Sequence, residues 1–118
     1  MDTQRTCYAL DLKDNPDLIA EYEHHHKPEN IWPEIPEGIR AGGIADMQIY
    51  RIDTRLFMII ETRQGVDPED AFAMIEKTPR QSEWGAFMQI FQQRLGMAEP
   101  NQYWVKMKPV FSLAACLK

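Results

Sequence analysis

The sequence predicts an α+β fold whose elements follow in the order β-α-β-β-α-β. Residues 5–12 and residues 44–60 alternate in side-chain polarity with a period of two, which is typical of strands that pair in a sheet. Residues 16–26 and the segment around Trp84 instead repeat apolar side chains at the spacing of a helix. This order is that of the ferredoxin-like unit, in which helices cover one face of an antiparallel sheet.

The first half of the chain has well-marked element boundaries. After the strand over residues 5–12, Asn15-Pro16-Asp17 supplies an N-cap, a proline at the first helical position and an acid in the first turn. We expect the helix that follows to end at Pro28. Helical periodicity restarts at Trp32-Pro33 and stops at Gly42-Gly43, so the first helical region is interrupted.

The second half begins with a predicted hairpin over residues 44–60. Asp67-Pro68 then predicts the start of a helix, and Thr78-Pro79 predicts its break. The last segment, residues 103–113, alternates in polarity and predicts a strand, with Pro109 placing it at an edge or a bulge. The helix between the break and this strand carries an apolar stripe, formed by Trp84, Phe87, Met88 and Phe91.

Composition and charge place the chain among ordinary globular proteins. Its 118 residues fit one domain, and 44% of them are hydrophobic and 26% charged. The formal net charge of −5 and the scattered basic residues argue against nucleic acid as a partner. The sequence contains no run of about 18 apolar residues. We therefore expect one domain over residues 1–118 that binds neither nucleic acid nor membrane.

Cysteine usage and missing motifs narrow the chemistry. The two cysteines, Cys7 and Cys116, lie far apart without CxxC spacing, which is typical of a reduced, cytoplasmic protein. The sequence has no dinucleotide-binding GxGxxG motif, no P-loop and no GxSxG motif. The functions that remain are cofactor-free acid–base catalysis and simple binding of a small molecule.

One face of the predicted sheet is left without helices. Several positions that would line this face carry large apolar or aromatic side chains, and an exposed patch of that size usually marks an interface. Two such sheets packed face to face would gain about 25 cal/mol per Å² of buried apolar area. We therefore expect a homodimer.

The run His24-His25-His26 is the most unusual local feature. Adjacent helical residues point about 100° apart, so three consecutive imidazoles cannot converge on one ion, and we expect no metal. Tyr22 and His26, four residues apart, share a helix face, where a phenol and an imidazole could serve as proton donor and base. The alternative is a structural role, because the helix dipole stabilises a histidine at a helix C-terminus.

Three tryptophans could stack on a sugar ring, although a tryptophan more often fills the core. Trp84 belongs to the apolar stripe, Trp32 lies in an irregular stretch where a pocket is expected, and Trp104 lies on the polar side of its predicted strand. Three carboxylates could hydrogen-bond a substrate or could be solvated surface groups, namely Glu34, Asp46 and Glu61.

These residues resemble a known family. Tyr22 and His26, followed by Ile31-Trp32-Pro33-Glu34, resemble the Y-x-x-x-H and I-W-P-E stretches of the L-rhamnose mutarotase family, and the likeness extends over residues 5–113. The resemblance implies a dimeric α+β barrel of ferredoxin-like units. It also implies an aldose 1-epimerase that interconverts the α and β anomers of a 6-deoxy-L-hexose, L-rhamnose or L-fucose, without cofactor or metal.

The family's functional residues match positions of this chain. His26 matches the catalytic histidine and Tyr22 the active-site tyrosine, so the resemblance assigns proton transfer to these two. Trp84 matches the first of two adjacent tryptophans and, with Trp32, is expected to bind the sugar. Gly85 stands where many members have the second tryptophan.

Two other functions fit the same fold, because fold does not fix function. One is a non-catalytic dimeric barrel that binds a small molecule, and the other is a cofactor-free monooxygenase. The choice between L-rhamnose and L-fucose also stays open, since Glu29-Asn30 lengthens the loop before the I-W-P-E motif and would alter the pocket.

Overall fold

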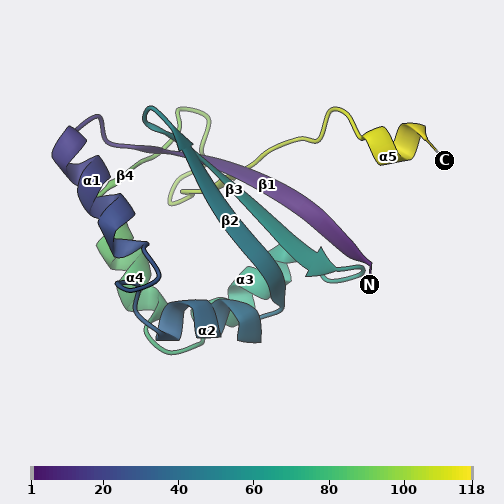
Figure 1. The fold of residues 1–118 in the computed structure, drawn as a ribbon, viewed down its shortest axis with the longest axis horizontal. Helices are drawn as coiled ribbons and strands as arrows, with labels where there is room; N and C mark the ends of the chain where they lie inside the picture. The colour runs from purple at the N-terminus through teal and green to yellow at the C-terminus, as the bar shows by residue number, and fades with distance from the viewer. Residues whose placement is uncertain (1, 118) are drawn as a thin grey trace.

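The structure, a computed structural model, describes residues 2–117 and has a mixed α/β fold built on one antiparallel sheet (Figure 1). Residues 1 and 118 of the predicted domain lie outside the described part. The long strands are β1 (Thr3–Leu12), β2 (Ile44–Ile52) and β3 (Arg55–Arg63). Two short strands, β4 (Gln92–Gln93) and β5 (Val105–Lys106), both pair with β1, and the strand order is β2-β3-β1-β4. The predicted hairpin is confirmed, and β2 forms one edge of the sheet.

Of the five helices in residues 2–117, four gather on one side of the sheet and one lies apart from them (Figure 1). The four are α1 (Pro16–His25), α2 (Glu34–Ala41), α3 (Pro68–Glu76) and α4 (Gln81–Met88), and the fifth is α5 (Leu113–Cys116). The predicted helix starts are confirmed. Asn15 Oδ1 accepts the N–H groups of Asp17 and Leu18 at 3.0 and 3.1 Å, and Asp67 Oδ1 accepts that of Glu69 at 2.9 Å. The predicted interruption between α1 and α2 is confirmed as well.

The polarity pattern of β3 separates the core from the open face, by which we mean the side of the sheet without helices. Leu56, Met58 and Ile60 are at most 3% exposed and pack toward the helices. Phe57 and Ile59, which alternate with them, are half-buried on the open face. Strands β1 and β2 pair with β3 in a register that keeps this alternation. The core therefore lies between the sheet and α1 to α4.

Helices α2 and α4 meet at a close contact around a glycine. A Cβ atom at Gly38 would clash with Thr78 Oγ1 and lie only 2.5 Å from Gln81 Nε2. Gln81 Nε2 in turn donates to the carbonyl oxygens of Glu34 and Ile35 at 3.3 and 3.2 Å. The first turn of α2 is thus fixed to the first residue of α4, which sets the distance between the two helices.

The C-terminal quarter departs from the predictions. The helix predicted through Phe91 ends at Met88, although Phe91 is still buried at 2% exposure in the turn that follows. The strand predicted over residues 103–113 is wrong, because only Val105–Lys106 pairs with β1. Pro109 lacks the N–H that a longer pairing would need, and the segment beyond it runs away from the sheet (Figure 1).

The helix contact at Gly38 should be sensitive to one methyl group. We expect Gly38→Ala to lower the free energy of unfolding by about 1–3 kcal/mol, because the added carbon overpacks the junction. Gly85→Ala is the matched control, since no atom lies within 4 Å of the Cβ it would add. This control should raise stability by about 0.5–1 kcal/mol through helix propensity. Urea unfolding of both variants checks the prediction, and equal effects would contradict it.

Candidate functional site

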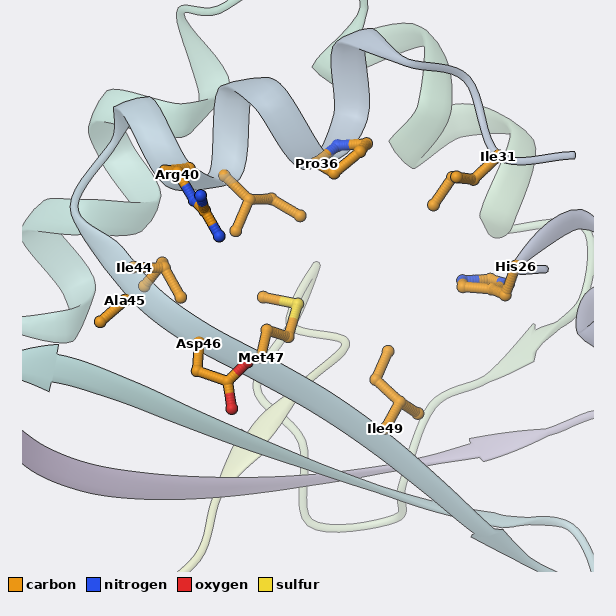
Figure 2. Close-up of a pocket in the computed structure, with 10 residues that line it drawn as sticks. His26, Ile31, Pro36, Arg40, Ile44, Ala45, Asp46, Met47 and Ile49 are labelled. Carbon is orange, nitrogen blue, oxygen red and sulfur yellow. The ribbon is translucent and has the colours of Figure 1, made fainter. Parts of the chain in front are cut away.

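His26 lines three cavities. One, of about 520 Å³, lies beside the end of α1 and is also lined by Tyr22 and Arg51. The other two share several lining residues and lie between β2 and the helices. The outer cavity has a volume of about 380 Å³, within the range of roughly 300–1,000 Å³ for small-molecule sites. Figure 2 shows it with His26 and Ile31 on one side and Arg40 and Asp46 on the other. The inner cavity has a volume of about 210 Å³. Its lining includes Tyr22, Gln81, Trp84 and Trp104, and both cavities share Ile31, Ile39, Met47 and Ile49.

Helix α1 brings Tyr22 and His26 together. Tyr22 lies in its last turns and faces the core with 4% exposure, and His26 is the C-cap residue that follows the helix. Their spacing of four residues puts both side chains on one helix face. The ring centroids lie 4.2 Å apart at an interplanar angle of 34°. The proximity predicted from the spacing is therefore present.

The hydrogen bond of His26 fixes its tautomer. His26 Nδ1 lies 2.7 Å from the carbonyl oxygen of Tyr22. A carbonyl oxygen only accepts hydrogen bonds, so the neutral imidazole carries its proton on Nδ1 and donates it there. Nε2 is consequently unprotonated and available as a base. Figure 2 shows the ring pointing toward the outer cavity.

Burial moves the pKa values of this pair in opposite directions. It lowers the pKa of His26 below its ordinary value of 6.5, because the charged imidazolium loses hydration in the apolar surroundings. It raises the pKa of Tyr22 well above its usual range, because the phenolate would lose hydration in the same way. The pair is therefore a neutral base beside a neutral phenol near pH 7.

The hydroxyl of Tyr22 is free to bind a ligand. Tyr22 Oη takes part in no hydrogen bond among the described residues. Within residues 2–117, the one side-chain oxygen or nitrogen that is sealed from solvent and has no hydrogen-bond partner is Glu34 Oε1. Tyr22 Oη is thus reached by solvent through a cavity, although the residue as a whole is buried. A substrate in the cavity can replace this solvent.

The two tryptophans predicted to bind a sugar occupy different places. Trp84 lines the inner cavity, and its ring centroid lies 5.3 Å from that of His26. Trp32 lines neither cavity and lies behind Trp84, with ring centroids 5.1 Å apart. The guanidinium carbon of Arg80 lies 3.9 Å from the centre of the Trp32 ring, so one face of that ring is covered. The structure thus brings Trp84, but not Trp32, to the cavity wall.

Trp104 is the cavity residue that sequence reasoning assigned to the wrong environment. The register pairs Lys106 with Tyr8, which faces the core, so Trp104 two residues earlier also faces the helices. The Lys106 side chain stays exposed, because its Nζ extends to the surface and lies 4.0 Å from Glu69 Oε1. Alternating polarity in this segment correctly predicts a strand at residues 105–106, but the side predicted to face the core is wrong. A lysine at the end of a short strand is a poor indicator of the solvent side.

The predicted carboxylates are divided between the site and other surfaces. Asp46 lines the outer cavity. Glu34 pairs with Arg80 at 3.7 Å, and Glu61 pairs with Arg5 at 3.2 Å. Of the three, only Asp46 is at a cavity that His26 also lines.

The three adjacent imidazoles contact different groups. His24 Nδ1 lies 3.5 Å from Asn30 Nδ2, the His25 ring packs on Phe87 at 4.8 Å, and His26 pairs with Tyr22. In the part of the chain that the structure describes, no group of three metal-ligating side chains comes together. Likewise, none of the helices in residues 2–117 is long and apolar enough to cross a membrane.

Comparison with known proteins finds similarity to sugar mutarotases. A sequence model of the family described as L-rhamnose mutarotase matches residues 5–113. An L-fucose mutarotase of Xanthomonas campestris pv. campestris is 37% identical over 114 residues, which cover 97% of this chain and 91% of that protein. An L-rhamnose mutarotase of Brucella anthropi is 31% identical over 108 residues, which cover 90% and 94%.

A solved structure shares the fold. The crystal structure of an L-rhamnose mutarotase from Formosa agariphila matches with a TM-score of 0.66 at 16% identity, covering 93% of this chain and 98% of that one. Identity this low shows likeness of fold alone, whereas the family model and the curated relatives show kinship. This chain belongs to the L-rhamnose mutarotase family of sugar isomerases.

Proposed function

We propose that this protein is a mutarotase that interconverts the α and β anomers of a 6-deoxy-L-hexose, L-rhamnose or L-fucose, by acid–base catalysis. The observation that carries the proposal is the Tyr22–His26 pair, a free imidazole nitrogen beside a free phenol at the edge of a cavity. Kinship with an L-rhamnose mutarotase and an L-fucose mutarotase supports the substrate class.

Anomer exchange requires two proton transfers. A base removes the proton from the O1 hydroxyl while an acid protonates the ring oxygen, so the C1–O5 bond breaks and an aldehyde forms. Rotation about the C1–C2 bond then presents the other carbonyl face to the O5 hydroxyl. The reverse transfers close the ring as the opposite anomer and return both groups to their starting states.

The pKa directions support one assignment of the two roles. His26, with its pKa lowered, is neutral and accepts the O1 proton on Nε2. Tyr22, with its pKa raised, retains its proton until the ring oxygen becomes basic and then donates it to O5. The opposite charges that develop lie on rings whose centroids are 4.2 Å apart, so they stabilise each other.

The inner cavity suits a deoxy sugar. Its wall is largely aliphatic and aromatic, with Ile35, Met58, Phe72 and Ile75 in addition to the side chains shared with the outer cavity. A methyl group at C6 gains from burial there, whereas a C6 hydroxyl would lose its hydrogen bonds to water. We propose that Trp84 packs on the sugar ring and that Trp32 supports Trp84 from behind.

We further infer that two ferredoxin-like units form a homodimeric α+β barrel. The open face carries half-buried Phe57 and Ile59. The C-terminal segment, residues 107–117, is exposed throughout and includes Val110 at 93% and Phe111 at 73% exposure. Apolar side chains exposed to this extent indicate a surface that a second copy covers. The strand order β2-β3-β1-β4 is compatible with such a sheet-to-sheet pairing.

The protein's thiols are compatible with a reducing compartment. Cys7 and Cys116 are both free. Unpaired cysteines are typical of proteins in the cytoplasm, where thiols are kept reduced. We therefore propose a cytoplasmic location.

Replacing His26 should abolish most catalysis without unfolding the protein. We expect His26→Phe to reduce the exchange rate by about 10²–10⁴-fold, the usual loss for a general acid or base. The measurement is NMR magnetisation exchange between the α and β anomeric protons of L-rhamnose and of L-fucose. His24→Phe, which changes an exposed neighbour in the same run, is the control and should keep full activity. A His26→Phe variant with normal rates would refute the assignment.

Activity should persist into mildly acidic solution. The lowered pKa of His26 keeps the imidazole neutral below pH 6.5, so the base is lost only when the pH falls below that lowered pKa. A background-corrected exchange rate, followed downward from about pH 8, should show an acid limb whose midpoint lies below 6.5. A midpoint at or above the ordinary value would show that burial does not govern this histidine.

Assembly should depend on the C-terminal segment. Sedimentation should show a dimer for the natural sequence and a weaker dimer or a monomer for Phe111→Lys, because a buried lysine at that interface loses hydration. Met74→Lys is the matched control, since Met74 is 55% exposed on α3, away from the open face. A monomeric natural protein, or equal effects of the two lysines, would count against the proposed interface.

A further inference from the structure

Gln81 is a polar residue in a largely apolar wall. It is the first residue of α4, it is only 8% exposed, and it lines the inner cavity together with Ile35, Ile75 and Trp84. Buried amides are normally hydrogen-bonded through both ends of the group. The partners of its two ends therefore show what this side chain can still bind.

The amide nitrogen is fully engaged with the backbone of α2. Nε2 donates to the carbonyl oxygens of Glu34 and Ile35 at 3.3 and 3.2 Å. Both partners are acceptors, so the NH₂ group must face them and the opposite orientation of the amide is excluded. Gly38 closes the space next to Nε2, since a Cβ there would lie 2.5 Å away. The direction of the amide is thus fixed before any ligand arrives.

The amide oxygen has no partner. Oε1 forms no hydrogen bond with any described residue. It is not sealed from solvent, because the one sealed side-chain oxygen or nitrogen without a hydrogen-bond partner in residues 2–117 is Glu34 Oε1. The side chain lines the inner cavity, and we infer that the accessible oxygen faces this space. Gln81, with its amide held in one orientation, thus lines the same cavity as Tyr22 and His26.

We propose that Gln81 is a substrate-binding residue whose Oε1 accepts a hydrogen bond from a ring hydroxyl other than O1. The inference rests on the proposed sugar function, in which His26 and Tyr22 act at O1 and O5. A fixed acceptor at Gln81 selects for a sugar that presents a donor at that place, because a sugar without this donor leaves the oxygen unpaired. Gln81 thereby determines specificity without taking part in proton transfer.

A thermodynamic cycle between the side chain and the sugar tests this. Natural protein and Gln81→Met are assayed by anomeric exchange with the 6-deoxy sugar that the protein accepts and with its monodeoxy analogues. We expect Gln81→Met to raise KM about threefold to tenfold with little change in kcat, the usual value of one neutral hydrogen bond. One monodeoxy analogue lacks the hydroxyl that Gln81 binds, and for this analogue the same substitution should leave KM unchanged. Ser82→Ala, an exposed neighbour on α4, is the control.

Equal rises in KM for the parent sugar and every analogue would overturn the proposal, because they would indicate a structural role alone. A second measurement does not require the variant to fold. In the natural protein, the ¹³Cδ resonance of Gln81 should shift as the sugar is added, and an unchanged resonance at saturation would also overturn the proposal. Failure of the proposed function is distinguishable, since it appears as no acceleration by the natural protein with any 6-deoxy hexose.

Discussion

The site depends on one hydrogen bond, from His26 Nδ1 to the carbonyl oxygen of Tyr22. In a continuing helix that carbonyl would accept the backbone N–H of His26, four residues later. Here the helix ends, the N–H of His26 turns to the carbonyl of Glu23 at 3.2 Å, and the Tyr22 oxygen is left for the imidazole. The end of α1 thus satisfies a terminal carbonyl and at the same time fixes which ring nitrogen can act as a base. Pro28, two residues later, favours this helix end, because it has no N–H to donate and its ring would clash with the preceding turn.

Under the proposed function, a single environment produces both the base and the acid. Desolvation disfavours whichever form of a group is charged, so it lowers the pKa of an imidazole and raises that of a phenol. No third charged group is required to divide the roles between His26 and Tyr22. In the proposed mechanism, the apolar wall that shifts the two pKa values also suits the methyl group of a deoxy sugar, so sugar binding and proton transfer both favour an apolar cavity.

Local features of the fold and the site were predictable from sequence, and nonlocal ones were not. The cap at Asn15 and the proximity of Tyr22 to His26 depend on residues within one or two turns, and both are present. Gln81 reaches the cavity only because α4 packs on α2, and Trp104 only because β5 pairs with β1. Spacing along the chain carries no information on such contacts. The strand predicted around Pro109 fails for the same reason, because alternation in polarity does not show that a partner strand exists.

Gly85 is a departure from the family pattern that leaves the cavities of this chain unaffected. The resemblance places a second tryptophan there, which would make its absence a change in the pocket. In this structure Gly85 is exposed, no atom lies within 4 Å of its missing Cβ, and it lines none of the three cavities that His26 lines. The cavity walls of this chain are therefore complete without that side chain. Under the proposed function, selection among deoxy sugars has to come from groups that reach the cavities, and Gln81 and Arg40 are two polar examples.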